Sequence, residues 1–191
     1  MLMDIIKARH SIRKYSGEPI SREEMEKVLE AGNYAPSAGG GQRSMMVGIL
    51  DRSLVEEIGV TNMAKFDRSS LLGSYVSKEQ PSVIDDESIK NGFYGAPAAI
   101  AVFGQDRFLF READAWCCAE NMVLQATELG LASCMISRAP ETFACPRGRE
   151  LLREWGVPEN YSAVCFVVLG HIDGAQPHTK PRKPGHVKII G

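Results

Sequence analysis

The sequence predicts a single domain in which helices alternate with a few short, buried strands. A capping box, Ser21-Arg22-Glu23-Glu24, precedes apolar residues at helical spacing, which is typical of an amphipathic helix. A second segment of helical length, 111–129, is apolar on nearly every side. Four apolar runs have the length of strands, and they lie at 45–50, 98–103, 131–137 and 163–169.

The N-terminal half should form three helices and one strand. A short helix is expected over 4–9. The helix that follows the capping box should end near Gly32 and Pro36, because glycine favours a helix C-terminus and proline disfavours helix at the residue before it. The apolar run 45–50 then predicts a strand, and 54–64 predicts a third helix.

The C-terminal half is dominated by the helix expected over 111–129, which closes at Gly130. Between residues 115 and 126 its only charge is Glu120. We therefore expect this helix to be buried on all sides, either at the centre of the fold or across a subunit interface. A shorter helix over 149–155 is expected between the last two strands.

Two segments lack a regular pattern. The stretch 67–92 is polar and has no clean period, so it is either a lid over a binding site or an excursion without a role. The tail, 174–191, contains no acidic residue, and its prolines favour an extended arm that can reach across a surface. Because no repeat or linker interrupts the chain, we assign 1–191 to one domain.

Charge and composition argue against several classes of function. The net charge of −2 gives no electrostatic attraction to nucleic acid or to anionic membranes. No apolar stretch reaches the ~18 residues of a membrane span, and the N-terminus lacks the pattern of a signal peptide. The five cysteines contain no C-x-x-C spacing, which argues against a disulfide framework, a zinc site or an iron–sulfur cluster. We therefore expect a cytoplasmic protein without a metal.

Two motifs in the first quarter of the chain suit a flat, phosphorylated ligand. Arg9-His10-Ser11-Ile12-Arg13 places two cations, an imidazole and a hydroxyl close together, as charge-assisted binding of a phosphate and a polyol requires. Ala35-Pro36-Ser37-Ala38-Gly39-Gly40-Gly41-Gln42 contains glycines that let the backbone approach a ring closely. No Lys-Ser or Lys-Thr follows, so this loop is not a nucleotide P-loop, and no dinucleotide fingerprint opens a strand–helix unit.

Three further motifs follow. Gly95-Ala96-Pro97 leads into one strand, Leu129-Gly130-Leu131-Ala132-Ser133-Cys134 into another, and the basic tail contains Lys180-Pro181-Arg182-Lys183-Pro184. In their order and spacing the five motifs resemble the FMN-dependent nitroreductase family, in its short, single-domain branch. The resemblance runs from about Asp4 to Ile190.

The resemblance implies an α+β fold and a two-chain assembly. Members of the family are homodimers with three layers, α/β/α, around a central mixed, mainly antiparallel sheet, and each C-terminal arm is exchanged onto the partner. Two FMN molecules lie at the subunit interface, and each is touched by both chains. The apolar helix and the extended basic tail of this sequence suit that arrangement.

The resemblance also assigns roles to individual residues. The first flavin motif matches Arg9, His10, Ser11 and Arg13, of which Arg9 and Ser11 would hold the phosphate and the ribityl chain. Arg13 would lie at the pyrimidine edge, where a positive charge stabilises the reduced ring. The remaining cofactor-binding residues are Pro36, Ser37, Ala38 and Gly39 from the other subunit, Asn91 at the ring, Met135, Ile136 and Ser137 beside it with a backbone N–H toward N5, and Lys180 and Arg182 at the phosphate.

By the same resemblance the chain is an enzyme that passes electrons from NADH or NADPH to a small acceptor by a ping-pong mechanism. The usual acceptors of the family are nitroaromatics and quinones, and no metal is required. Three alternatives stay open: a dehalogenase-type relative on the same scaffold, a non-catalytic flavin-binding redox sensor or carrier, and a plain domain without a cofactor.

One loop departs from the family pattern. Gly40, Arg43 and Ser44 stand where members commonly carry an asparagine and a Pro-Trp pair. A bulky wall would thereby become a flexible one, so we hypothesise a more open or more mobile acceptor pocket.

Overall fold

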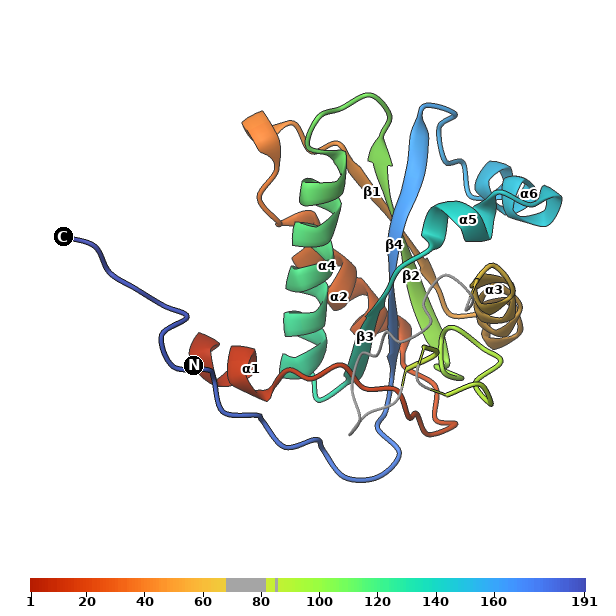
Figure 1. The fold of residues 1–191 in the computed structure, drawn as a ribbon. Coiled ribbons are helices and arrows are strands. Elements are labelled where there is room, and N and C mark those ends of the chain that lie inside the picture. Colours follow the sequence, from red (N-terminus) through yellow and green to blue (C-terminus); the bar gives the residue numbers. More distant parts are fainter. Residues whose placement is uncertain (68–81, 85) are drawn as a thin grey trace.

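An antiparallel sheet lies at the centre of the fold (Figure 1). The computed structural model describes residues 1–67, 82–84 and 86–191, and in these the sheet has four strands. Each neighbouring pair is antiparallel, and one isolated parallel bridge joins Ser11 to Ser133 on the outer edge of the sheet. In spatial order the strands are β1 (Ser44–Ile49), β2 (Ala98–Gln105), β4 (Tyr161–Gly170) and β3 (Ala132–Ile136).

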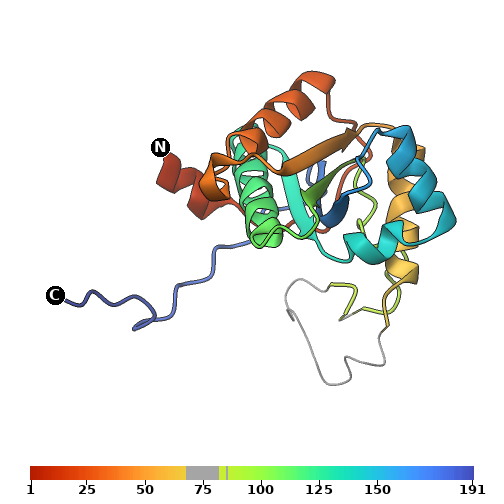
Figure 2. The same ribbon diagram turned by 90° about the horizontal axis from the view of Figure 1, so that it is seen from above.

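Helices cover both faces of this sheet and make three layers (Figure 1, Figure 2). On one face lie α2 (Arg22–Asn33) and α4 (Arg111–Glu128). On the other lie α3 (Arg52–Ala64), α5 (Ala139–Phe143) and α6 (Pro146–Glu154). The short α1 (Leu2–Ala8) packs against α4, near the end where α4 stops. The predicted α+β class, with α/β/α layers and a mainly antiparallel sheet, is confirmed.

The central strands are buried on both faces because their side chains alternate between two cores. In β2, Ile100 and Val102 face α2 and α4, whereas Ala101 and Phe103 face α3 and α5. All four side chains are fully buried. The sheet, packed between two helical layers, holds the edge strand β3 in place, and among the described residues the outer edge of β3 has no neighbouring strand.

The elements expected from the sequence all form, with ends displaced by a few residues. The helix α5 was missed because its five residues are too short to show a helical period. The tail 174–191 is extended and almost entirely exposed in the structure (Figure 1). Most of the segment 67–92 lies outside the described residues, so its role as a lid stays a prediction.

The expectation that α4 is buried on all sides was wrong for the single chain. Its outward face carries Trp116, which is 37% exposed, and the exposed Glu120. In α1, Ile6 is 39% exposed. Both helices therefore keep apolar surface that one chain does not cover. No helix within the described ranges has both the length and the hydrophobicity needed to cross a membrane.

We predict that Gly148→Ala destabilises the fold, although alanine favours helix. A Cβ at this position in α6 would lie 2.5 Å from the Cα and 2.7 Å from the carbonyl oxygen of Phe143, and this backbone cannot yield. We expect a net loss of about 1–2 kcal/mol in the free energy of unfolding, measured by urea denaturation. The matched control is Gly17→Ala, whose Cβ would come no closer than 3.6 Å to its neighbours. Equal stability of the two variants would contradict the prediction.

Candidate functional site at the edge of β3

The N-terminal motif lies along the outer edge of β3. The Ile12 N–H donates to the Ser133 carbonyl at 2.9 Å, and Ser11 and Ser133 form the parallel bridge. Ile12 is buried, while Ser11 and Arg13 on either side of it are half-buried. The hydroxyl of Tyr15 donates to the Ile12 carbonyl at 2.7 Å and holds the turn closed. The motif is therefore fixed to the sheet by its backbone, and its polar side chains are left to face outward.

Beyond this bridge the edge of β3 is open. The Ser133 carbonyl points away from β4, because it accepts from Ile12. Backbone groups in an antiparallel ladder alternate in direction, so the N–H of Met135, two residues on, also points away from β4. No backbone carbonyl among the described residues accepts from it. An N–H donor thus stands at the open edge beside Arg13.

The edge carries positive charge that no carboxylate neutralises. Arg9 and Arg13 form no ion pair with any acidic side chain in the described part of the chain. The Arg13 guanidinium lies 5.8 Å from the centre of the Tyr94 ring. Burial raises the pKa of the Cys134 thiol behind them, and the charges of Arg13 and Arg9 partly oppose that rise. This combination of charge and hydroxyl suits an anionic ligand.

The C-terminal tail passes over the same motif. The Thr179 hydroxyl lies 3.2 Å from the Lys7 carbonyl and 3.3 Å from His10 Nε2, and the Gln176 amide donates to the Ala8 carbonyl. Lys180 follows directly, so the structure brings the start of the basic tail next to His10. The two ends of the chain therefore meet beside Arg9. Arg182, two residues farther on, is exposed.

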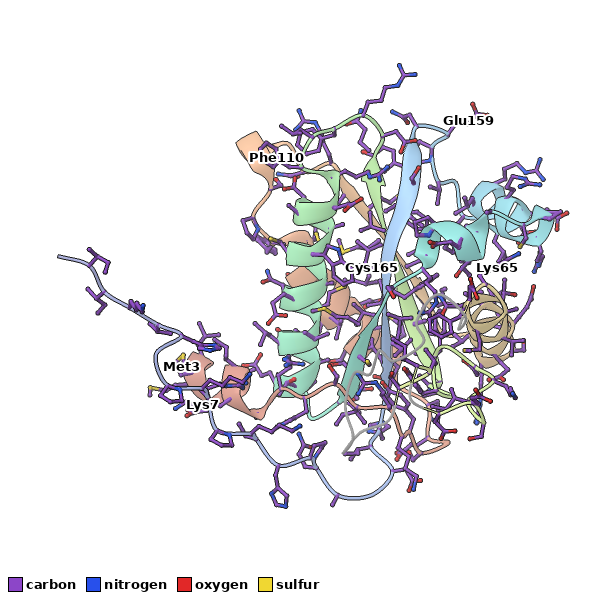
Figure 3. The ribbon with its side chains drawn as sticks, in the orientation of Figure 1. Met3, Lys7, Lys65, Phe110, Glu159 and Cys165 are labelled. Atoms are coloured by element: carbon purple, nitrogen blue, oxygen red, sulfur yellow. The ribbon has the colours of Figure 1, made fainter. Side chains whose placement is uncertain are left out.

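The glycine-rich loop lies at the opposite end of α4. Its backbone is held there because the Ala38 N–H donates to both carboxylate oxygens of Asp114, at 3.2 and 3.1 Å, in the first turn of α4. The 18 residues of α4 span about 27 Å. Figure 3 labels Phe110 at this end of α4 and Lys7 at the other. One chain therefore keeps Pro36–Gly39 apart from the arginine motif.

This loop forms a turn in the structure. Gly39 and Gly40 take φ values of +62° and +63° in a short 3-10 helix, a backbone conformation that suits glycine. The Gln42 N–H donates to the Ser37 hydroxyl at 3.1 Å, and the Arg43 guanidinium lies 4.7 Å from the centre of the Phe108 ring. Whether the loop leaves a more open or more mobile acceptor pocket stays a hypothesis.

Asn91 is engaged elsewhere than at the arginine motif. Its amide nitrogen donates to Glu56 in α3 at 2.6 Å, and its amide oxygen accepts from the Phe93 N–H at 2.7 Å. These bonds tie the segment before β2 to α3. The structure therefore does not bring Asn91 to the group formed by the other predicted residues, and its role at a ring stays a prediction.

Sequence reasoning missed a network at the C-terminal end of β3. Asn62 of α3 is fully buried and donates to the Ser137 carbonyl and to the Thr142 hydroxyl, both at 3.0 Å. Its oxygen accepts from Arg138 at 2.9 Å. The contacts join residues about 75 positions apart, and the only local signal was a polar residue on an apolar helix face. The network fixes the turn that follows Met135, Ile136 and Ser137.

A family model described as the nitroreductase family matches residues 6–171. A protein of Archaeoglobus fulgidus, provisionally named as an NADH dehydrogenase/NAD(P)H nitroreductase, is 30% identical over 88% of this chain and 84% of its own length. The NADPH-flavin oxidoreductase of Vibrio harveyi is 26% identical over 98% of this chain and 72% of its own.

Two solved structures are similar along nearly their whole length. The nitroreductase of Bacteroides fragilis with bound FMN has a TM-score of 0.79 and 30% identity, covering 100% of this chain and 98% of that one. The nitroreductase of Desulfitobacterium hafniense with bound FMN has a TM-score of 0.80 and 27% identity, covering 99% and 98%.

We predict that Asn62→Ala loosens the end of β3. The change leaves the Ser137 carbonyl and a buried part of Arg138 without a partner, so the free energy of unfolding should fall by about 2–3 kcal/mol. Urea denaturation measures this loss. Asn33→Ala, at an exposed position at the end of α2, is the control and should be nearly neutral. A small, equal effect in both variants would show that the network is not structural.

Proposed function

The chain belongs to the nitroreductase family, and we propose that it acts as a homodimeric, FMN-dependent oxidoreductase that passes electrons from NADH or NADPH to a small acceptor. One observation carries the proposal. Two arginines that form no ion pair with the described acidic side chains stand on the open edge of β3, and the glycine-rich loop lies at the far end of α4. A site built from both needs a second copy of the chain.

The chemistry of the donor set fits FMN. A phosphate requires cations and hydrogen-bond donors, and Arg9 and Ser11 offer these at the start of β3. We place Lys180 and Arg182 at the same phosphate, because the tail already touches His10 through Thr179. The His10 imidazole and the Ser11 hydroxyl can form hydrogen bonds with the hydroxyls of the ribityl chain.

The ring would lie farther along the open edge of β3. There the Met135 N–H points away from β4, at the open edge, and can donate to a ring nitrogen. Arg13 holds a positive charge beside the pyrimidine edge, where it favours added negative charge. From the partner, Pro36–Gly39 would cover the ring, since a turn of small residues lets the backbone approach a flat surface.

Exposed apolar side chains support a homodimer. Trp116 on α4, Met3 and Ile6 on α1, and Val187 and Ile189 in the tail all keep more than a third of their surface open in one chain. Patches of this kind on the side of the molecule that carries the site are typical of subunit interfaces. We propose that the tail lies on the partner, as the resemblance to the family implies.

FMN held by these residues would supply the redox chemistry of a ping-pong mechanism, in which NAD(P)H gives up a hydride in one half-reaction and the acceptor takes the electrons in the next. The chain's own residues would bind FMN, orient its ring and place positive charge beside it. Nitroaromatics and quinones are the proposed acceptors, and the cytoplasm is the proposed compartment. Sustained NAD(P)H oxidation with a quinone would separate the enzyme from a flavin-binding sensor, and release of halide from a haloaromatic would favour the dehalogenase alternative.

We predict that Arg9→Ala weakens FMN binding about ten- to hundred-fold, because it removes charge-assisted hydrogen bonds to the phosphate. Titration of the flavin-free protein with FMN, followed by flavin fluorescence, measures the dissociation constant. Arg22→Ala, which removes an exposed arginine at the start of α2, is the matched control. Unchanged affinity in Arg9→Ala, or equal loss in both variants, would refute the assignment of the phosphate site.

We further predict that two defective variants complement each other. Arg9→Ala damages the edge of β3, and Ala38→Trp blocks the loop. In a mixed dimer both changes fall on one site, and the other site is intact. When equal amounts of the two chains are refolded together, about half of the dimers are mixed, so about a quarter of the wild-type FMN binding should return. Measuring the bound FMN tests this. If each site belonged to a single chain, mixing would restore nothing.

A further inference from the structure

The strand β3 leads directly into α5 (Figure 1), and Arg138 stands at their junction in an unusual backbone conformation. Its φ is +66° and its ψ is 23°, which is the left-handed region that few residues other than glycine adopt. The backbone is held there by Thr142, whose N–H and hydroxyl both donate to the Arg138 carbonyl. A large charged side chain at such a position costs conformational free energy, and this cost points to a role for the side chain.

The guanidinium is held firmly but is poorly satisfied. It stacks over the Phe66 ring at 4.7 Å and, among the described residues, donates one hydrogen bond, to Asn62, of the five that a guanidinium can donate. The Nε atom is buried and has no hydrogen-bond partner there. Glu141 acts on this charge electrostatically, but no carboxylate in the described part of the chain lies within ion-pair distance. A preorganised, half-buried cation with no ion pair to these residues suits an anionic ligand.

An anion bound by Arg138 would be distinct from the cofactor phosphate. The phosphate-binding motif sits beside Ser133, at the start of β3, and the strand from Ser133 to Ile136 alone spans about 10 Å. Arg138 lies beyond that end. It lies three residues beyond Met135, whose N–H stands at the open edge of β3, and the bonds from Asn62 to Ser137 and Arg138 fix this turn. We therefore place Arg138 at the ring end of the proposed site, where an acceptor would enter.

We propose that Arg138 is a specificity residue that binds the anionic group of the acceptor, so that aromatic acceptors carrying a carboxylate are preferred over their neutral counterparts. This inference rests on the proposed function and deepens it. Phe66 and Tyr94 supply aromatic surface beside the cation for the body of such an acceptor.

The test compares 4-nitrobenzoate with 4-nitrobenzamide as acceptors for the FMN-loaded protein. In Arg138→Met, kcat/KM for the carboxylate should fall about ten- to hundred-fold and that for the amide should change little. Arg138→Lys should restore part of the preference. Arg153→Met, an exposed arginine on α6, changes the net charge equally and should leave the preference intact. Binding of benzoate and benzamide, measured by calorimetry, should show the same selectivity without turnover.

Three outcomes would overturn the inference while the proposed function stands. In the first, the preference for the carboxylate acceptor survives Arg138→Met. In the second, Arg138→Met lowers the affinity for FMN rather than for the carboxylate. In the third, the variant has a higher KM for NADPH but an unchanged KM for NADH. Reduction of neither acceptor by a flavin-loaded wild type would instead sink the proposed function. The flavin content and the thermal midpoint of each variant show whether it folds. If Arg138→Met does not fold, Arg138→Gly removes the same charge, and glycine favours the left-handed backbone at this position.

Discussion

The length and rigidity of α4 hold the glycine-rich loop and the arginine motif apart within one chain. At one end α4 anchors the glycine-rich loop through the bond between Asp114 and Ala38, and at the other it meets α1 and the turn into β3. A helix of this length does not bend back on itself, so the two predicted halves of the flavin site cannot meet within one chain. The exposed apolar residues of α1, α4 and the tail then have a common explanation, because a second copy would cover them while completing each site.

The site also holds positive charge that the described residues do not balance with an ion pair. Arg9, Arg13 and Arg138 lie along β3 without an ion pair to any acidic side chain in the described ranges, and burial lowers the pKa of Arg138. Tyr94, half-buried between them, has its pKa raised chiefly by burial, so it stays neutral and does not neutralise them. Such unpaired charge opposes folding, and an anionic ligand removes that cost when it binds. Sites that violate the usual rules of stability in this way are where function is expected.

The sequence was most informative where local signals are strong. The capping box formed as predicted, with the Ser21 hydroxyl accepting from the Glu24 N–H and the Glu24 carboxylate accepting from the Ser21 N–H. The apolar runs form strands that helices cover on both faces of the sheet, and this burial on two faces is why the runs contain few polar residues. The helix α5 was missed because it owes its form to Pro140 and to bonds from Thr142 rather than to any period.

For the site, the sequence predicted the parts but not their arrangement. The arginine motif and the tail were recognisable from residue order, and the structure brings them together. Tyr94 and Arg138 carried no local signal, and Asn62 carried only that of a polar residue on an apolar helix face, because their roles arise from contacts that link α3, the segment before β2 and the end of β3. The position of Asn91 in the chain suggested a ligand contact. In the structure its amide bonds to Glu56 and Phe93, and its role at a ring stays a prediction.

A crystal structure of the protein with FMN bound tests the central claim most directly. The account predicts that each phosphate contacts Arg9 and Ser11 of one chain while Pro36–Gly39 of the other chain lies over the same ring. A flavin held entirely by one chain, or a phosphate bound away from the start of β3, would contradict it.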